Sequence, residues 1–112
     1  MMYNELKAIA EASPYGFTVR LSDLTFVTTG YSVAYAATQN GFGNDGLRAA
    51  IDHAESLEGG GVVGGWLNQQ NGRYYFDSVR LFTDRAAALA FARENDQLAI
   101  WHFDTMSEIR LD

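Results

Sequence analysis

The chain has 112 residues and a formal net charge of −6, with 14 acidic residues against 8 basic ones. This length predicts one domain, residues 1–112, and the absence of cysteine excludes disulfides, thiolate metal sites and a cysteine nucleophile. The negative charge opposes a phosphate backbone and disfavours general nucleic-acid binding. The chain has neither an apolar run long enough to span a membrane nor a signal-peptide pattern, so we expect a cytoplasmic protein.

The first 30 residues predict a helix followed by a strand. Residues 2–12 are rich in helix formers and end before Ser13-Pro14, where the proline disfavours the α conformation of the preceding residue. Apolar and polar residues alternate over 15–21, which is typical of a half-buried strand, and residues 25–28 are a candidate for a second, shorter strand. We therefore expect residues 1–28 to form an N-terminal extension of helix and strand.

Residues 31–103 predict strands and helices in the order β-α-β-β-α-β. The strands cover 31–37, 62–68, 73–82 and 98–103, and the helices cover 46–58 and about 83–94. Asn44 or Asp45 is expected to cap the first of these helices, and Asn71-Gly72 supplies the positive φ that a hairpin turn needs. This order predicts an α+β fold with a ferredoxin-like core, in which both helices cover one face of an antiparallel sheet. The tail after residue 103 has room for one more short element.

Within each of these strands most of the large aromatic residues share one alternation parity. They are Tyr31, Tyr35, Trp66, Tyr74, Phe76, Trp101 and Phe103. Because successive side chains in a strand point to opposite faces, we expect an aliphatic face under the helices and an aromatic face on the other side. The aromatic face would be covered by residues 2–28, by a second copy in a homodimer, or by a ligand. These seven residues are candidates for partner binding, as is an acidic helix face made of Asp52, Glu55 and Glu58.

The sequence motifs predict no metal and no cofactor. GxGxxG occurs at 41–46 and 59–64, but the second copy follows a helix, and Asp45 in the first places a carboxylate where a phosphate would sit. His53 and His102 lack metal-ligand spacing, although Asp104 lies close to His102 in sequence. Asp77 interrupts an aromatic strand, and we expect it to form a structural ion pair with an arginine.

Four segments of the C-terminal half carry a family resemblance: Gly64-Gly65-Trp66, residues 75–77, residues 84–93 and residues 95–101. In these segments the chain resembles small uncharacterised proteins and domains of bacterial conjugative elements and phages. The resemblance implies an origin in a mobile element and brings no catalytic residue with it. We therefore predict a non-enzymatic accessory protein that acts by binding another protein, including as an inhibitor of host defence of the anti-CRISPR or antirestriction type.

Two other functions stay open. One is a cofactor-independent enzyme, in which two ferredoxin-like units enclose a pocket that holds His102, Asp77 or a tyrosine. The other is single-stranded RNA binding, because residues 71–82 resemble the aromatic strand of RNA-recognition sheets. The Gly-Phe-Gly-Phe-Val order of those strands is missing from this chain.

Overall fold

The computed structural model describes residues 2–111, which form an α+β fold of three α-helices and a six-stranded antiparallel sheet. The helices are α1 (Met2–Ala12), α2 (Gly43–Glu55) and α3 (Arg85–Glu94). The strands are β1 (Gly16–Arg20), β2 (Tyr31–Ala34), β3 (Val62–Asn68), β4 (Arg73–Phe82), β5 (Ala99–His102) and β6 (Ser107–Arg110). A short 3₁₀ helix, η1 (Ala36–Thr38), follows β2.

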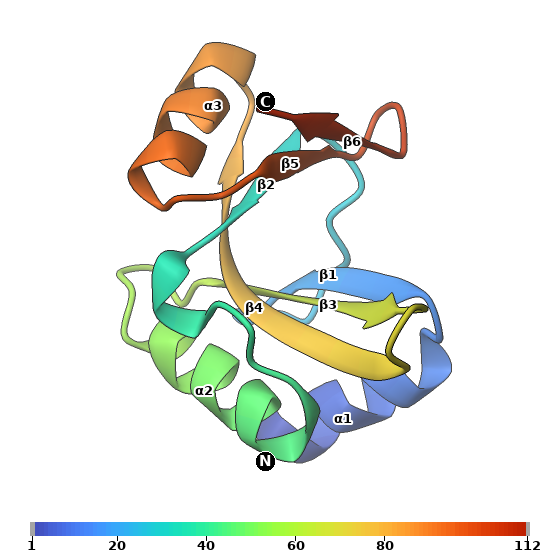
Figure 1. The fold of residues 1–112 in the computed structure, drawn as a ribbon. Helices are drawn as coiled ribbons and strands as arrows, with labels where there is room; N and C mark the ends of the chain where they lie inside the picture. Colours follow the sequence, from blue (N-terminus) through green and yellow to red (C-terminus); the bar gives the residue numbers. More distant parts are fainter. Residues whose placement is uncertain (1, 112) are drawn as a thin grey trace.

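The strands are arranged in the order β1-β3-β4-β2-β5-β6 (Figure 1). β1 and β2 are consecutive along the chain, but β3 and β4 lie between them in the sheet, so residues 21–30 must cross the sheet to join them. Figure 1 shows this connection on the side of the sheet away from the helices. Val27 within it is only 6% exposed, so the connection covers part of that side.

All three helices pack on one face of the sheet. One buried cluster joins α1 and α2 to the sheet, and its members are Leu6, Phe17, Val19, Leu21, Leu47, Ala50, Ile51, Ala54, Val63 and Phe76. A second cluster joins α3 to β2 and β5 through Val33, Ala88, Ala92 and Ile100. Val63 pairs with Ser78 and Val33 pairs with Arg80, two residues further along β4, so alternation places both clusters on the same face. The other face of the sheet is called the open face below.

The elements expected from the sequence are present, with differences at their ends. β2 stops at Ala34 and gives way to η1, and residues 25–28 contribute a single bridge between Phe26 and Val19 in place of a strand. α2 starts at Gly43 after Phe42, and no side chain caps it, so the expected cap at Asn44 or Asp45 is wrong. The tail does form a further element, β6. Among residues 2–111, no helix combines the length and the apolar character that a membrane crossing requires.

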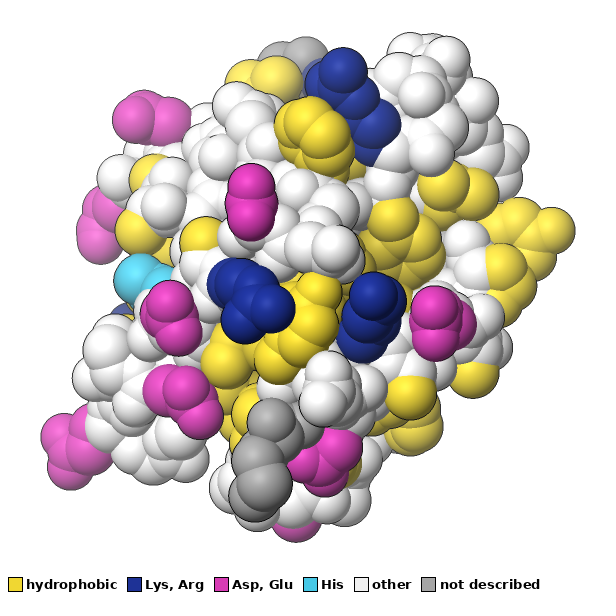
Figure 2. All heavy atoms as spheres, turned by 90° about the horizontal axis from the view of Figure 1, so that it is seen from below, with side chains coloured by type: hydrophobic (Ala, Val, Ile, Leu, Met, Phe, Trp, Pro, Cys, Tyr) yellow, Lys and Arg dark blue, Asp and Glu magenta, His cyan; other side chains and the backbone are white. Residues whose placement is uncertain are grey.

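On the outer side of α1 and α2, acidic side chains are interspersed with basic and apolar ones (Figure 2). Asp52 and Glu55 are exposed and line a shallow hollow of about 300 Å³ together with Tyr3 and Arg48. Glu58 lies beyond the end of α2, so the expectation of three acids on one helix face is wrong. The guanidinium of Arg48 lies 4.0 Å from the centre of the Tyr3 ring, which places a positive charge beside the two acids.

Candidate binding face

The predicted aromatic face is wrong, because the strand register divides its residues between the two faces of the sheet. Trp66 pairs with Tyr75, so these two side chains share one face of the sheet. The side chains of Tyr74 and Phe76 lie on the other face. Phe76 belongs to the buried cluster under α2, and Tyr74 packs against the same cluster. The loop between Asn68 and Arg73 has an even number of residues, so even-numbered residues of β3 pair with odd-numbered residues of β4. The length of this loop can be read from the sequence, and it was the available signal that Trp66 shares a face with Tyr75.

Tyr31 and Tyr35 also lie on the helix side. Tyr31 packs in the α3 cluster and stacks on His102, with ring centroids 4.4 Å apart. Tyr35 contacts the rings of His53 and Phe91, at 4.8 and 5.1 Å. Both side chains are therefore part of the packing between the sheet and the helices.

By strand alternation, the side chains of Trp101 and Phe103 lie on the open face, as does that of Trp66. Trp101 pairs with Ser32 of β2 and is partly buried. Phe103 is 8% exposed, and its N–H donates to the carbonyl of Gly30 in the connection from β1 to β2, at 2.9 Å. Of the seven predicted residues, only Trp66 is largely exposed on the open face, with 46% of its surface accessible.

Three side chains from neighbouring segments form a continuous aromatic row on the open face: Phe42, Tyr75 and Trp66. Phe42 forms an isolated bridge with Tyr75, and their ring centroids lie 5.7 Å apart. Tyr75 and Trp66 stack at 5.1 Å with an angle of 19° between the ring planes. Phe42 is 44% exposed, similar to Trp66, so the two ends of the row are accessible and its centre is partly buried.

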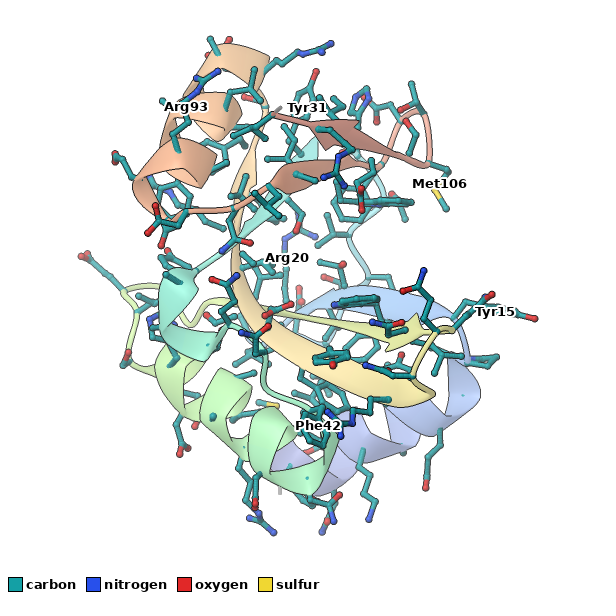
Figure 3. The ribbon with its side chains drawn as sticks, in the orientation of Figure 1. Tyr15, Arg20, Tyr31, Phe42, Arg93 and Met106 are labelled. Atoms are coloured by element: carbon teal, nitrogen blue, oxygen red, sulfur yellow. The ribbon has the colours of Figure 1, made fainter. Side chains whose placement is uncertain are left out.

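Two glycines place Phe42 in this row. A Cβ at Gly46 would lie 2.5 Å from the carbonyl carbon of Gly41, so the loop before α2 closes tightly only without side chains. The carbonyl of Gly41 accepts a hydrogen bond from Phe76, at 3.0 Å, and this fixes Phe42 beside β4 (Figure 3). The guanidinium of Arg73 lies 4.3 Å from the centre of the Phe42 ring. The glycine motif at residues 41–46 was considered only as a phosphate-binding loop, so Phe42 was missed.

Asp77 lies beside the aromatic row. It is the next residue of β4 after Tyr75 whose side chain is on the open face. Its partner on β3 is Gly64, which contributes no side chain. Burial raises the pKa of Asp77 to about 6, and a hydrogen bond from the side chain of Trp66 acts in the opposite direction. The predicted ion pair with an arginine is not found: the ion pairs of the described residues join His102 to Asp104 and Arg110 to Glu108.

The residues considered for catalysis do not come together. His102 alternates with Ile100 and lies on the helix side, whereas Asp77 lies on the open face. Nδ1 of His53 lies 2.8 Å from Oγ of Ser78, and Nδ1 of His102 lies 2.9 Å from Oγ1 of Thr105. Within residues 2–111, no group of three or more His, Asp and Glu side chains is placed to hold a metal ion.

The open face therefore offers accessible aromatic surface next to one partly buried carboxyl group. This combination is suited to binding a side chain with an extended apolar or cationic part. Comparisons with protein-family models, with curated proteins and with solved structures find no match for this chain.

Proposed function

We propose that this chain is a non-enzymatic binding protein that docks a protein partner on its open face. The aromatic row of Phe42, Tyr75 and Trp66 carries the proposal. Aromatic side chains are enriched at the centres of protein interfaces, where a rigid ring buries a large area at a small entropy cost. In this chain Phe42 and Trp66 are 44% and 46% exposed, whereas the side chains on the helix side of the sheet form a well-buried core.

Asp77 indicates the chemistry of the partner. Its carboxyl group is taken partly out of water, and its ionised form is stabilised mainly by the hydrogen bond from Trp66. An arginine or lysine of the partner would supply the missing positive charge and lie against the rings of Trp66 and Tyr75. The net charge of −6 would attract such a basic surface over a longer range.

We also propose that residues 31–103 form a ferredoxin-like core. The central strands follow the order β3-β4-β2-β5, all antiparallel, and their sequence order with α2 and α3 is β-α-β-β-α-β. This is the pattern that leaves one sheet face without helices and available for binding. α1, β1 and β6 would then be additions at the two ends of the core.

The resemblance to proteins of mobile elements supports a host protein or another element protein as the partner, including a component of a host defence system. Single-stranded RNA is the competing ligand, because aromatic rings on an open sheet face also stack with bases. The carboxyl group of Asp77 within the site and the net charge of −6 favour a basic protein over a polyanion.

Affinity capture with two matched variants tests the proposal. Trp66→Ala removes one end of the aromatic row, and Leu98→Ala removes an apolar side chain that is 68% exposed outside the row. We expect a partner that wild type and Leu98→Ala retain and that Trp66→Ala loses, with both variants folded by circular dichroism. Identical captured proteins for the two variants would refute the role of the aromatic row. Quenching of tryptophan fluorescence by single-stranded RNA, absent in Trp66→Ala, would favour the RNA ligand instead.

A further inference from the structure

The carboxyl group of Asp77 keeps acceptor capacity that residues 2–111 do not fill. An ionised carboxylate accepts about four hydrogen bonds through its two oxygens, and the donor that reaches Asp77 within these residues is the indole N–H of Trp66. Gly64, the partner of Asp77 on β3, has no side chain. Asp77 is partly exposed, so a ligand can reach the acceptor positions that Trp66 leaves free.

The arginines on the open face of β1 and β4 have other contacts. Arg20 lies on β1, two strands away from Asp77, and its charge acts on Asp23. Arg73 lies four residues before Asp77 on β4, which is about 13 Å along a strand, and its guanidinium contacts the ring of Phe42. Within the described part of the chain, neither arginine forms an ion pair with Asp77. A cation for Asp77 must therefore come from another molecule.

The side chains around Asp77 are aromatic or apolar. Tyr75 and Val79 flank it on the open side of β4, and Trp66 lies diagonally across from it on β3. On the other side of β4 the chain leaves β2 for η1, which begins with Ala36. Tyr75 is the one titratable residue among these neighbours. A cation that binds Asp77 therefore lies against aromatic surface.

We propose that the cation bound by the open face is the guanidinium of an arginine, and that a lysine in the same place binds more weakly. The arginine would belong to the protein partner, so this assignment rests on the proposed function. A guanidinium is planar and donates two parallel N–H groups to the two oxygens of a carboxylate, whereas an ammonium acts as a point charge. A guanidinium is also less strongly hydrated, so it loses less on entering a partly buried site.

The chain itself packs guanidinium groups on aromatic rings. The guanidinium of Arg73 lies 4.3 Å from the centre of the Phe42 ring, and that of Arg48 lies 4.0 Å from the centre of the Tyr3 ring. The ammonium of Lys7 lies 6.0 Å from the same Tyr3 ring. In the proposed complex the methylene groups of the partner's arginine pack against the aromatic row, and its guanidinium reaches Asp77.

Nuclear magnetic resonance of the full chain tests the assignment, because the chain has two tryptophans and each has one indole N–H. The indole N–H of Trp66 donates to Asp77, and that of Trp101 on β5 serves as an internal reference. The probes are N-acetyl-arginine amide, its lysine counterpart with the same charge, and its citrulline counterpart with a similar shape and no charge. At constant ionic strength we expect a saturable shift of the Trp66 resonance with the arginine probe. The lysine probe should bind at least about fivefold more weakly, and the citrulline probe should give no saturable shift.

Two further measurements establish that Asp77 holds the probe. Asp77→Asn removes the charge and should weaken binding of the arginine probe by at least about tenfold. Asp52→Asn, on the outer side of α2, changes the net charge equally and should bind like wild type. The second measurement uses the unaltered chain: burial raises the pKa of Asp77 to about 6, and the cation binds the ionised form. The affinity at pH 5 should therefore be about tenfold lower than at pH 7.5.

Several results would overturn the proposal. They are equal affinity for the arginine and lysine probes, no shift at Trp66, a binding curve that Asp77→Asn leaves unchanged, and an affinity that does not fall toward pH 5. After any of these results, a protein captured through the aromatic row would still support the proposed function. Selective binding of the arginine probe without a captured protein would count against the proposed function alone.

Discussion

Asp77→Asn is expected to stabilise the protein at neutral pH and to have little effect in acid. The substitution keeps the size of the side chain and an oxygen that accepts the hydrogen bond from Trp66, and it removes the charge. In the folded chain, burial raises the pKa of Asp77 from its usual 3.8 to about 6. Above pH 6 the wild type therefore carries a carboxylate that is less favourable in the folded state than in the unfolded state.

The size of the effect follows from the two pKa values. Between pH 4 and pH 6 the unfolded chain has lost the proton of Asp77 and the folded chain still holds it, so stability falls as the pH rises. A gap from 3.8 to about 6, at about 1.4 kcal/mol per pH unit, corresponds to about 3 kcal/mol. We expect Asp77→Asn to gain up to about that amount over wild type at pH 8 and close to nothing at pH 3 to 4.

Urea unfolding followed by tryptophan fluorescence measures this difference. Wild type and Asp77→Asn are unfolded at closely spaced pH values from 4 to 8, and the difference in their free energy of unfolding is plotted against pH. Other titrating groups contribute to both proteins and cancel in the difference. A difference that stays constant with pH, or that grows toward acid pH, would refute the placement of Asp77 as a partly buried carboxyl group without a cationic partner.

Three further substitutions test the packing that supports the open face. Gly65→Ala should lower the free energy of unfolding by about 2 kcal/mol, because its Cβ would lie 2.5 Å from the nearest aromatic ring carbon. Gly64→Ala is its matched control, since the nearest atom to that Cβ is 3.6 Å away, and equal losses for the two would contradict the register of β3. Asp84→Ala should cost about 1 kcal/mol, measured by thermal unfolding, because the carboxylate caps α3 by accepting a hydrogen bond at 2.9 Å; an unchanged melting temperature would argue against this cap. Leu47→Ala, at a site 1% exposed, should cost about 3 kcal/mol, and Leu98→Ala less than about 0.5 kcal/mol, in urea unfolding; a similar cost for both would be inconsistent with α2 covering the core.

Local patterns in the sequence predicted the elements well. The ranges of β3 and β4 agree with the predicted ones, because alternation, the glycines before β3 and Asn71-Gly72 after it are all local signals. α1 was likewise bounded by Ser13-Pro14. The fold class could be predicted because it depends mainly on the order of such elements.

The composition of the open face could not be predicted in the same way. Which face a strand residue occupies depends on pairing with other strands, and a shift of one residue moves every side chain to the opposite face. Trp66 was assigned to the face of Tyr74 although the even hairpin loop pairs it with Tyr75. Phe42 enters the aromatic row only through the bridge to Tyr75, a contact between residues far apart in sequence that no local pattern indicates.

Site-specific photocrosslinking in cells tests most directly whether a protein partner docks on the open face. A photoreactive phenylalanine analogue at position 42 lies at an end of the aromatic row, and the same analogue at position 52 lies on the outer side of α2, where Asp52 is exposed. We predict a crosslinked protein from position 42 and none from position 52, with the crosslink mapped next to an arginine or lysine of the partner. Crosslinking of the same protein from position 52 alone, or equally from both positions, would contradict docking on the open face.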